Sequence, residues 1–568
     1  MRGFRKHSLD FHPYPSPKKE KTVMKRVLIL LICGVSVMVQ AGMWKPEFPK
    51  LIEFSWNSPD TQYLREHVKE MEARTPYQGL GIHVKAKVKW NGKDLLCQYN
   101  TICSPIAWKK EWFAQAIDDL KHTEFKQFTD NFVRTGVCPG NVSLFSDSDW
   151  AAVCNNFRIM SEIAKECGMK GLAFDPEVYG EKLFIHNDSW GHTLEESRKQ
   201  ARLRGQQFAD AIFTPFPDMT FFCFFWHSYL LDSYNKVGSD TYHDTFIDFV
   251  NGIYDHLPPT VSIIDGNETH GYHAAEEKDF EALNSQVFYK YMTGIDMVNF
   301  AKARTQVHVA PAFFLDPYFN NSNKNWARNL KWDTRPNRTR YFIENLSYAA
   351  KVADKYIWTW GENGSWWQDK PGELYSWESR SPGVTKALRR FVSQGQPTAG
   401  PTGKEPNMLK NPDFEDMKGY DATAKSPKIA GWGFWRSNPS QGTYGLETLP
   451  NGGHGAFFSN IQNACFIQHH PAEYGDMYEF SVKVWRSNPN ENASVRIRWM
   501  DEKGRWCSEK EDRSEQAREP GEDGWCTVTV VAKVPVKAHR VSVLLCGADV
   551  KGKVVFDDAK LVKCPTGD

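Results

Sequence analysis

The sequence predicts an α/β protein in which a (β/α)8 TIM barrel is followed by an all-β jelly-roll sandwich. Eight short apolar segments alternate with amphipathic helical patterns between residues 51 and 367, and this alternation is typical of parallel strands joined by helices. From residue 407 onward, short alternating runs separated by Gly, Asn and Pro replace the helical patterns. Such runs favour antiparallel strands packed as two sheets.

The eight predicted strands are rich in aromatic and β-branched residues and are apolar at nearly every position. Parallel strands that are buried on both faces have this composition. They cover residues 51–56, 79–84, 131–137, 171–175, 220–226, 261–265, 307–314 and 356–360. Helices are predicted between them; after the first strand, for example, Leu64, Val68 and Met71 recur at helical spacing.

The N-terminus has the pattern of an export signal. Lys25 and Arg26 precede an apolar run over residues 27–39, and Ala41 supplies a small residue for cleavage. The run is too short for an ordinary membrane-spanning helix. We therefore predict a signal peptide cleaved after Ala41 and a secreted or periplasmic protein without a membrane partner. Translation from Met1 or from Met24 fits this pattern equally.

Composition divides the chain into four predicted parts. They are an N-terminal extension with the signal peptide (1–41), the barrel (42–393), a Gly/Pro/Thr linker (394–406) and the sandwich (407–568). The 70 Lys and Arg residues balance 69 Asp and Glu residues, and no basic stripe is present, so no nucleic-acid partner is expected. Cys97–Cys103 and Cys507–Cys526 are candidate disulfides, but the sequence does not fix the pairing.

Three motifs in the last domain resemble those of carbohydrate-binding module family 4/9, the CenC type. They cover residues 407–415, 431–435 and 555–561. The resemblance extends over roughly residues 405–565. It implies a jelly roll that binds glycan chains in a cleft or at an edge, often with a structural Ca²⁺. The barrel is more loosely similar to secreted glycosidase-like barrels in the order of its strand ends.

Tryptophans in this last domain are candidate platforms for sugar rings, because an aromatic face can stack on a pyranose. Trp435, Trp485 and Trp499 are the candidates, and burial in the core is the alternative for each. Trp506 and Trp525 lie in polar surroundings, where exposure is an alternative.

Acidic residues follow four of the eight predicted strands. In a (β/α)8 barrel the carboxyl ends of the strands form the active site, so these side chains are expected to converge there. They are Asp175, Glu177, Asp265, Glu268, Asp316 and Glu362. Glycoside hydrolysis needs two such carboxyl groups, one as the acid and one as the nucleophile or base.

Glu177 is the predicted acid/base. Asp175 and Glu177 are two residues apart, so both point to one face while the chain stays extended, and Pro176 favours extension. Two close carboxylates raise one pKa, as a general acid requires. The candidate partners are, in order, Glu268, Glu362 and Asp316. A structural role for Asp175, as a cap or as a partner of a neighbouring strand, remains the alternative.

Aromatic and imidazole side chains near the strand ends complete the predicted sugar site, since rings can stack on sugars and imidazoles can donate to hydroxyls. These substrate-binding candidates, which include one acid, are Trp56, His83, Tyr179, Trp226, His227, Asp265, His270, Trp360 and Trp367. His227, Asp265 and His270 could alternatively hold a metal, but no spacing demands one and none is predicted. A histidine at a strand end can also be purely structural.

Together these features predict a secreted glycoside hydrolase that cleaves O-glycosidic bonds of a polysaccharide or oligosaccharide without a cofactor, targeted by its sandwich. The alternatives are a non-catalytic glycan-binding protein and a barrel enzyme of another class, either a lyase or a metal-dependent deacetylase. GxSxG, Walker and HExxH motifs are absent from the sequence. The sugar, the linkage, the stereochemical outcome and the oligomeric state stay open.

Overall fold

The computed structural model describes residues 48–564, apart from residues 178–182, 187–190, 230–244, 320–337, 369–374, 394–402, 451 and 522. The predicted signal peptide, Tyr179 and most of the predicted linker therefore lie outside the described residues, and the predicted domain boundaries stay predictions. Within the described ranges, no helix is long and apolar enough to cross a membrane.

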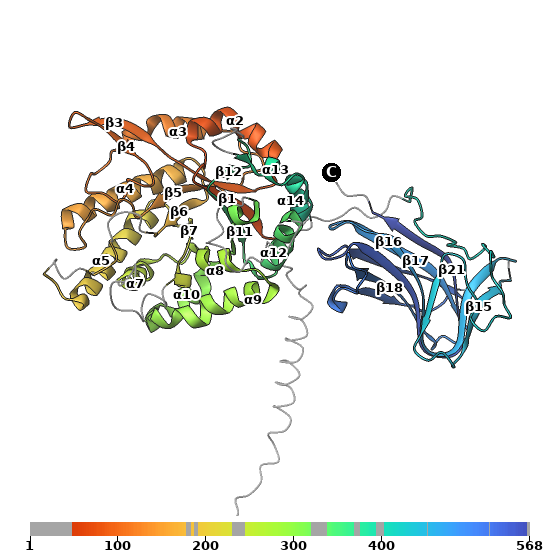
Figure 1. The fold of residues 1–568 in the computed structure, drawn as a ribbon. Coiled ribbons are helices and arrows are strands. Elements are labelled where there is room, and N and C mark those ends of the chain that lie inside the picture. The colour runs from red at the N-terminus through yellow and green to blue at the C-terminus, as the bar shows by residue number, and fades with distance from the viewer. Residues whose placement is uncertain are drawn as a thin grey trace, which may run out of the picture. The chain divides into compact units, whose positions relative to one another are not determined.

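The predicted α/β fold is confirmed: in the described residues, nine parallel strands form one curled sheet (Figure 1). In sheet order they are β10 (Ala312–Phe314), β11 (Tyr356–Gly361), β1 (Lys50–Ser55), β2 (Gly79–Ile82), β5 (Phe132–Gly136), β6 (Gly171–Asp175), β7 (Thr220–Cys223), β8 (Ser262–Asp265) and β9 (Val307–Val309). Every predicted strand has a counterpart in this sheet. The prediction succeeds because parallel strands covered on both faces are continuous apolar runs.

The seventh predicted strand, residues 307–314, is divided into β9 and β10. Pro311 lies at the division and has no N–H to donate to a sheet ladder. The N–H of Ala310 donates to the carbonyl of Asp265 in β8 (2.9 Å), and the N–H of Trp358 in β11 donates to the carbonyl of Pro311 (3.1 Å). β9 pairs with β8 and β10 pairs with β11. This one segment therefore supplies the strands at both ends of the sheet order.

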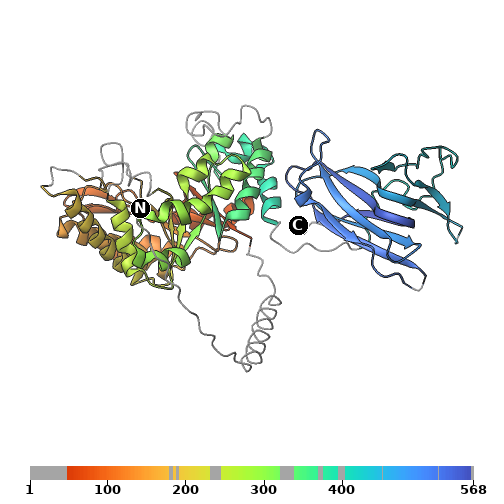
Figure 2. The same ribbon diagram turned by 90° about the horizontal axis from the view of Figure 1, so that it is seen from below.

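Most helices lie outside the curl of the sheet (Figures 1 and 2), whereas the short helix over Glu268–His273 contributes Tyr272 to the cluster inside it. The α-helices of the described residues are α2 (Thr61–Arg74), α3 (Ala114–Lys121), α4 (Asp147–Glu166), α5 (Leu194–Phe213), α7 (Phe246–His256), α8 (Glu268–His273), α9 (Glu277–Ser285), α10 (Phe300–Gln306), α11 (Leu315–Phe319), α12 (Arg338–Val352), α13 (Trp377–Arg380) and α14 (Val384–Ser393). Their starts follow local sequence. Thr193 and Glu196 form a capping box at α5, and Ser146 caps α4.

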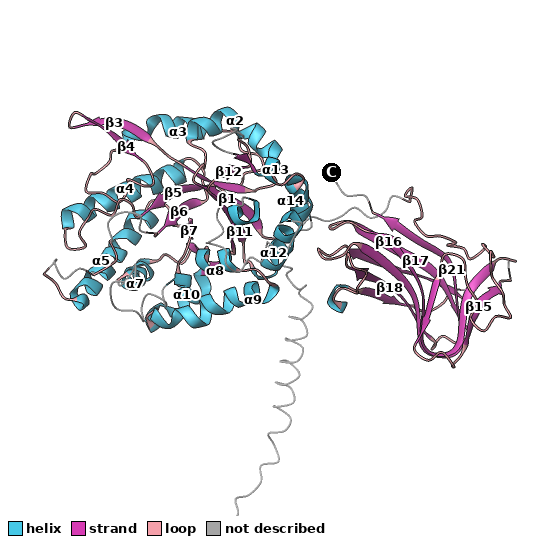
Figure 3. Cartoon of the chain, in the orientation of Figure 1, coloured by secondary structure: helices cyan, strands magenta, loops and turns pink. Residues whose placement is uncertain are grey.

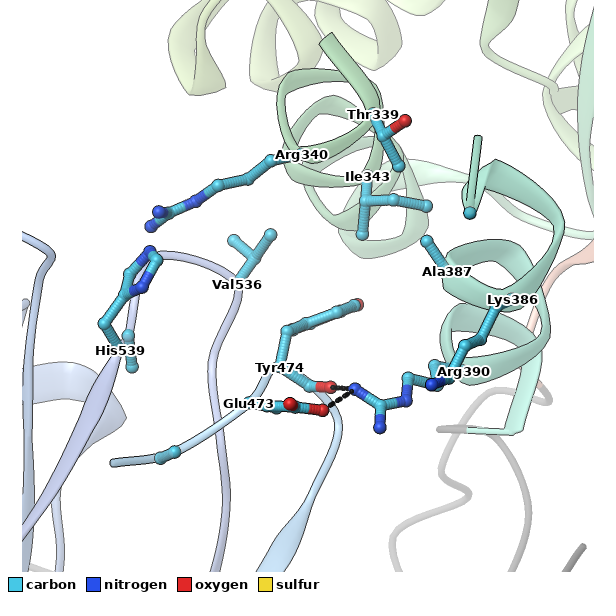
Figure 4. A pocket seen from close by; sticks show the side chains of 13 residues that line it. Thr339, Arg340, Ile343, Lys386, Ala387, Arg390, Glu473, Tyr474, Val536 and His539 are labelled. Atoms are coloured by element: carbon cyan, nitrogen blue, oxygen red, sulfur yellow. Dashed lines mark hydrogen bonds and ion pairs between the residues drawn. The ribbon is translucent and has the colours of Figure 1, made fainter. Parts of the chain in front are cut away.

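Helices α12 and α14 pack side by side at the end of this part of the chain (Figure 4). Ile343 of α12 and Ala387 of α14 lie on their facing sides. The hydroxyl of Thr339 at the start of α12 shares a hydrogen bond of 2.5 Å with the hydroxyl of Ser381, just before α14.

A short hairpin, β3 (Ala86–Trp90) and β4 (Lys93–Cys97), follows β2 and was not predicted. Its turn is Asn91-Gly92, with φ angles of 47° and 77°. Asn-Gly is the usual sequence of a tight hairpin turn because both positions need a positive φ. The sequence signal was therefore present. A second small pair joins β12 (Gly364–Ser365) to β13 (Tyr375–Ser376).

Successive side chains of the curled sheet enter two different cores, as the period of two in a strand requires. Leu51 and Val133 pack toward the helices. The inward-facing cluster is rich in aromatic rings; its members include Ile52, Phe54, Phe132, Ala173, Phe222, Phe224, Ile264, Ala312, Phe314, Tyr356, Trp358 and Trp360. The inside of the curl is therefore filled by side chains. Any ligand site must lie beyond this layer, at an end of the strands.

The C-terminal region consists of antiparallel β-sheet (Figure 3). Its strands are β14 (Gly433–Arg436), β15 (Thr443–Thr448), β16 (His454–Pro471), β17 (Met477–Arg486), β18 (Asn492–Met500), β19 (Arg513–Gln516), β20 (Trp525–Lys533) and β21 (Arg540–Lys563). Alternate residues of β17, such as Phe480 and Val482, are buried in one apolar core. The long strand β21 pairs with β16, β17 and β18 and so connects the sheet.

The two candidate disulfides are not formed: Cys97, Cys103, Cys507 and Cys526 are all free thiols. The N–H of Cys103 donates to the carbonyl of Cys138 (3.0 Å).

Trp358 should be the residue on which the inner layer depends most. Its indole N–H donates to the carbonyl of Gly266 (2.7 Å), and its ring stacks on Phe224 with centroids 4.7 Å apart. We expect Trp358→Ala to lower the free energy of unfolding by about 3–5 kcal/mol, as large aromatic truncations do. Urea titrations followed by far-UV circular dichroism measure this loss. Trp506→Ala, at a 43% exposed ring, is the control. Equal losses in the two variants would contradict the assignment.

Candidate active site

Two neighbouring carboxyl groups lie at the carboxyl end of β6. Asp175 is the last residue of the strand and is buried, and its Oδ1 accepts the N–H of Glu177 (3.0 Å). Both line a cavity of about 250 Å³, whose wall is formed by Trp56, Tyr99, Asn100, Gly136, Val137, Cys138, Pro139, Asp175 and Glu177. The cavity is close to the lower limit of usual small-ligand pockets, about 300 Å³.

Glu268 joins these two acids from β8. The chain leaves β8 at Asp265, turns through Gly266 and Asn267, and begins α8 at Glu268, whose N–H donates to the carbonyl of Phe224 (3.1 Å). Gly266 is required here because a Cβ would lie 2.7 Å from that same carbonyl oxygen. Burial raises the pKa of Glu268 well above its usual range, and the charges of Asp175 and Glu177 raise it further.

Asp175 experiences the same environment less strongly. Burial, followed by the charge of Glu177, raises the pKa of Asp175 to about 7, while the Arg134 guanidinium opposes the shift. Two buried carboxyl groups with raised pKa values, each close to the charge of Glu177, do not both ionise readily near neutral pH. The site therefore holds at least one carboxylic acid beside carboxylate at that pH.

Arg134 is the cation of the site, and the sequence analysis missed it. It lies buried in β5, where Nη1 donates to the carbonyl of Ser55 (2.8 Å). Its guanidinium carbon is 4.6 Å from the ring centroid of Tyr99 and 4.9 Å from that of Trp360. Such cation–π contacts stabilise a buried guanidinium. A charged residue inside an apolar strand was the available signal for Arg134, whereas Tyr99 follows the unpredicted hairpin.

His83 packs against Tyr99 of the cavity wall and is in its neutral form. Its ring stacks on Tyr99 with centroids 4.7 Å apart, and Nε2 accepts a hydrogen bond from Arg134 (3.4 Å). Burial lowers the pKa of His83 well below its usual range, and the charge of Arg134 acts in the same direction. His83 therefore acts as a hydrogen-bonding group rather than as a cation.

Trp56 also lines the cavity, and Trp360 and Glu362 lie beside it. The ring of Trp56 is 39% exposed and packs edge-on against Trp360, with centroids 5.5 Å apart. Burial, followed by the charge of Asp316, raises the pKa of Glu362, while a hydrogen bond from Trp56 opposes the shift. Glu362 also senses the charge of Glu177, so it lies near the acids of β6.

Asp316 and Asp265 hold loops in place. The carboxylate of Asp316 is fully buried and accepts the N–H groups of Glu362 (2.8 Å) and Asn363 (3.1 Å). Asp265 is likewise buried and accepts the hydroxyl of Ser228 (2.7 Å) and the N–H of Asn267 (2.9 Å). Each of these acids fixes the chain on which a site carboxyl, Glu362 or Glu268, is carried.

Other predicted site residues lie elsewhere. Trp226 and His227 are fully buried, and both bond the hydroxyl of Tyr254 in α7 (2.8 and 2.7 Å), so neither presents a face to the cavity. The reason is that β7 ends at Cys223, after which strand alternation no longer applies. Trp367 is buried among the helices, and His270 is half-buried on α8.

The predicted tryptophan platforms of the C-terminal region differ in exposure. Trp435 on β14 is 54% exposed. Trp485 on β17 is half-buried and lies opposite Trp525 of β20. Trp499 is a core residue, whose indole donates to the carbonyl of Glu511 (2.9 Å).

The structural Ca²⁺ that the family resemblance implies for this region stays a prediction, since a Ca²⁺ site can also use backbone carbonyl and amide oxygens. In the described part of the chain, no three His, Cys, Asp or Glu side chains are placed to hold a metal ion. In the closing motif, the carboxylate of Asp558 is instead paired with Lys483 (2.8 Å).

No protein-family model matches the sequence, and no curated protein matches it. Matching solved structures include TmCBM61 in complex with β-1,4-galactotriose (15% identity over 28% of this chain and 99% of that one, TM-score 0.20). The CBM22-1 xylan-binding domain of Paenibacillus barcinonensis Xyn10C matches at 11% identity over 27% and 93% (TM-score 0.21). Arabinose-bound MgGH51 α-L-arabinofuranosidase matches at 15% over 28% and 26% (TM-score 0.21), so this chain spans about a quarter of that enzyme. TM-scores this low carry no argument about fold or function.

Asp175→Asn should stabilise the protein at alkaline pH. A carboxyl group whose folded pKa of about 7 exceeds its unfolded value stabilises the fold at low pH and loses that contribution as pH rises through 7. The amide carries no charge, so we expect a gain on the order of 1–3 kcal/mol at pH 8 and a much smaller change at pH 4. Urea unfolding at both pH values measures this difference. The exposed Asp118→Asn is the control, and an equal effect at both pH values would contradict the burial argument.

Proposed function

We propose that the protein is a secreted glycoside hydrolase in which Glu268 and Glu177 cleave an O-glycosidic bond. The single observation that carries this proposal is the proximity of three acids: Asp175 and Glu177 line the cavity beside the exposed Trp56, and the charges of both act on Glu268. In this proposal the curled sheet is a (β/α)8 barrel closed across Ala310 and Pro311, which places the acids at the end where such barrels carry their active sites. Secretion rests on the predicted signal peptide alone.

Glu268 is the proposed general acid. A general acid must keep its proton near neutral pH until the leaving oxygen takes it. Burial and the charges of Asp175 and Glu177 all favour the protonated form of Glu268. Sequence spacing alone favoured Glu177 for this role, because it could not reveal the charge that surrounds Glu268.

Glu177 is the proposed nucleophile or base. Its side chain is half-buried and lines the cavity, so it is accessible to a bound sugar or to a water molecule. The transition state of glycoside hydrolysis resembles an oxocarbenium ion, and the charges of Glu177 and Asp175 would stabilise the positive charge that develops on the sugar. The anomer of the first product distinguishes the nucleophile from the base.

The walls of the cavity suit a sugar. The exposed ring of Trp56 offers a face for stacking on a pyranose, and the carboxyl of Glu362 beside it can bond a hydroxyl group. In the C-terminal region, proposed to be a jelly roll, Trp435 offers a second exposed ring. A tethered sugar-binding module would raise the local concentration of a polymeric substrate.

Reducing-end release by residues 42–568 on a panel of plant, algal and host polysaccharides tests the proposal. We expect Glu177→Gln and Glu268→Gln to reduce release about 10²–10⁴-fold, the usual contribution of such groups, while the exposed control Glu281→Gln on α9 keeps wild-type activity. Binding of a glycan without release by the wild type would favour the non-catalytic alternative. Equal activity in all variants would overturn the assignment of these carboxyls.

Substrates with an activated aryl leaving group should separate the two roles. Such a group leaves without protonation, so we expect the aryl glycoside to restore bond cleavage in Glu268→Gln but not in Glu177→Gln. Rescue of Glu177→Gln alone would return the acid role to Glu177.

The pH profile gives a separate test of the acid. The wild-type rate on natural substrate should fall as pH rises through the raised pKa of Glu268, and this fall at alkaline pH should be absent from Glu268→Gln.

A further inference from the structure

Two cysteines face each other in the C-terminal sheet. Cys465 of β16 and Cys546 of β21 are directly opposite in the antiparallel register, and both are free thiols. The neighbouring pairs Ala464–Gly547 and Phe466–Leu545 continue the same register without a shift. The two thiols are therefore aligned by an uninterrupted ladder between the two longest strands of the sheet.

The register satisfies the geometry of a disulfide bond. Directly opposite residues of antiparallel strands have Cα atoms about 4.5–5.5 Å apart, and disulfides span Cα distances of about 4.4–6.8 Å. Side chains at opposite positions project from the same face of the sheet. Cys465 and Cys546 also act on each other's pKa values, as neighbouring thiols do.

The chemistry of the pair is asymmetric. Cys465 is 7% exposed and Cys546 is half-buried. Cys465 lowers the pKa of Cys546, and the positive charges of Arg496 and Arg498 on β18 lower it further despite burial. A thiol with a lowered pKa close to arginines is the more reactive nucleophile.

We propose that Cys465 and Cys546 are a redox-active pair that forms a cross-strand disulfide when the protein meets a disulfide oxidant such as oxidised glutathione. The Cys546 thiolate attacks one sulfur of the oxidant and releases one reduced thiol. Cys465, after losing its proton, attacks the sulfur of Cys546 in the mixed disulfide and releases the second. Two protein thiols are oxidised to one disulfide, and one oxidant disulfide is reduced to two thiols.

The bond would lie within a row of side chains that crosses the sheet. Trp435 of β14 is opposite Cys465, and Ser494 of β18 is opposite Cys546. The exposed ring of Trp435 is therefore next to the pair. The disulfide would close a loop of about 80 residues, and loops of this length restrict the unfolded chain strongly.

The test is peptide mapping of the full-length folded protein. The protein is equilibrated with oxidised glutathione, its remaining thiols are alkylated, and the linked peptides are identified by mass spectrometry before and after reduction. We expect a Cys465–Cys546 link that dithiothreitol reverses. Cys546→Ser should remove it and leave Cys465 free to be alkylated, whereas the control Cys507→Ser should keep it.

Thermal unfolding gives a second readout. We expect oxidation to raise the melting temperature of the C-terminal transition by about 5–15 °C in the wild type and to leave Cys546→Ser unchanged. Alkylation of both cysteines after oxidation, a link that joins either of them to another cysteine, or glutathione retained on Cys546 without the link would each overturn the proposal.

Discussion

The burial of several carboxyl groups around one guanidinium is the constraint on which the end of the curled sheet depends. Asp175 and Glu268 both sense the charge of Arg134, and both are shielded from water. Moving a charge out of water is unfavourable unless it is paired or neutralised. Arg134 neutralises part of the negative charge, and bound protons neutralise the rest. The number of protons that these carboxyl groups bind therefore depends on how deeply they are buried.

Rings and a backbone carbonyl hold Arg134 in place. Tyr99 and Trp360 contact its guanidinium, and the carbonyl of Ser55 accepts one of its N–H groups. The aromatic inner layer of the sheet thus supports the site directly, since Trp360 is part of that layer.

The strands could be predicted because each buried parallel strand is a continuous apolar run, and the acids because each follows such a run. Side-chain direction could not be predicted in the same way. Asp316 follows a strand as expected, but it turns to the backbone N–H groups of Glu362 and Asn363. Trp226 lies beyond the end of β7 and packs outward. Sequence periodicity assigns a face only while the strand continues. It also does not predict that a charged residue within a strand, such as Arg134, is buried.

The hydrogen bond from Trp358 to the carbonyl of Gly266 has a consequence for how this protein could change. It joins a residue that fills the interior to the turn that carries Glu268 two residues later. Substitutions that repack the interior while preserving its volume can keep the fold, yet they would shift this turn. Stability and the position of Glu268 are therefore not independent traits here, and a homologue with another residue at position 358 would need a different support for this turn.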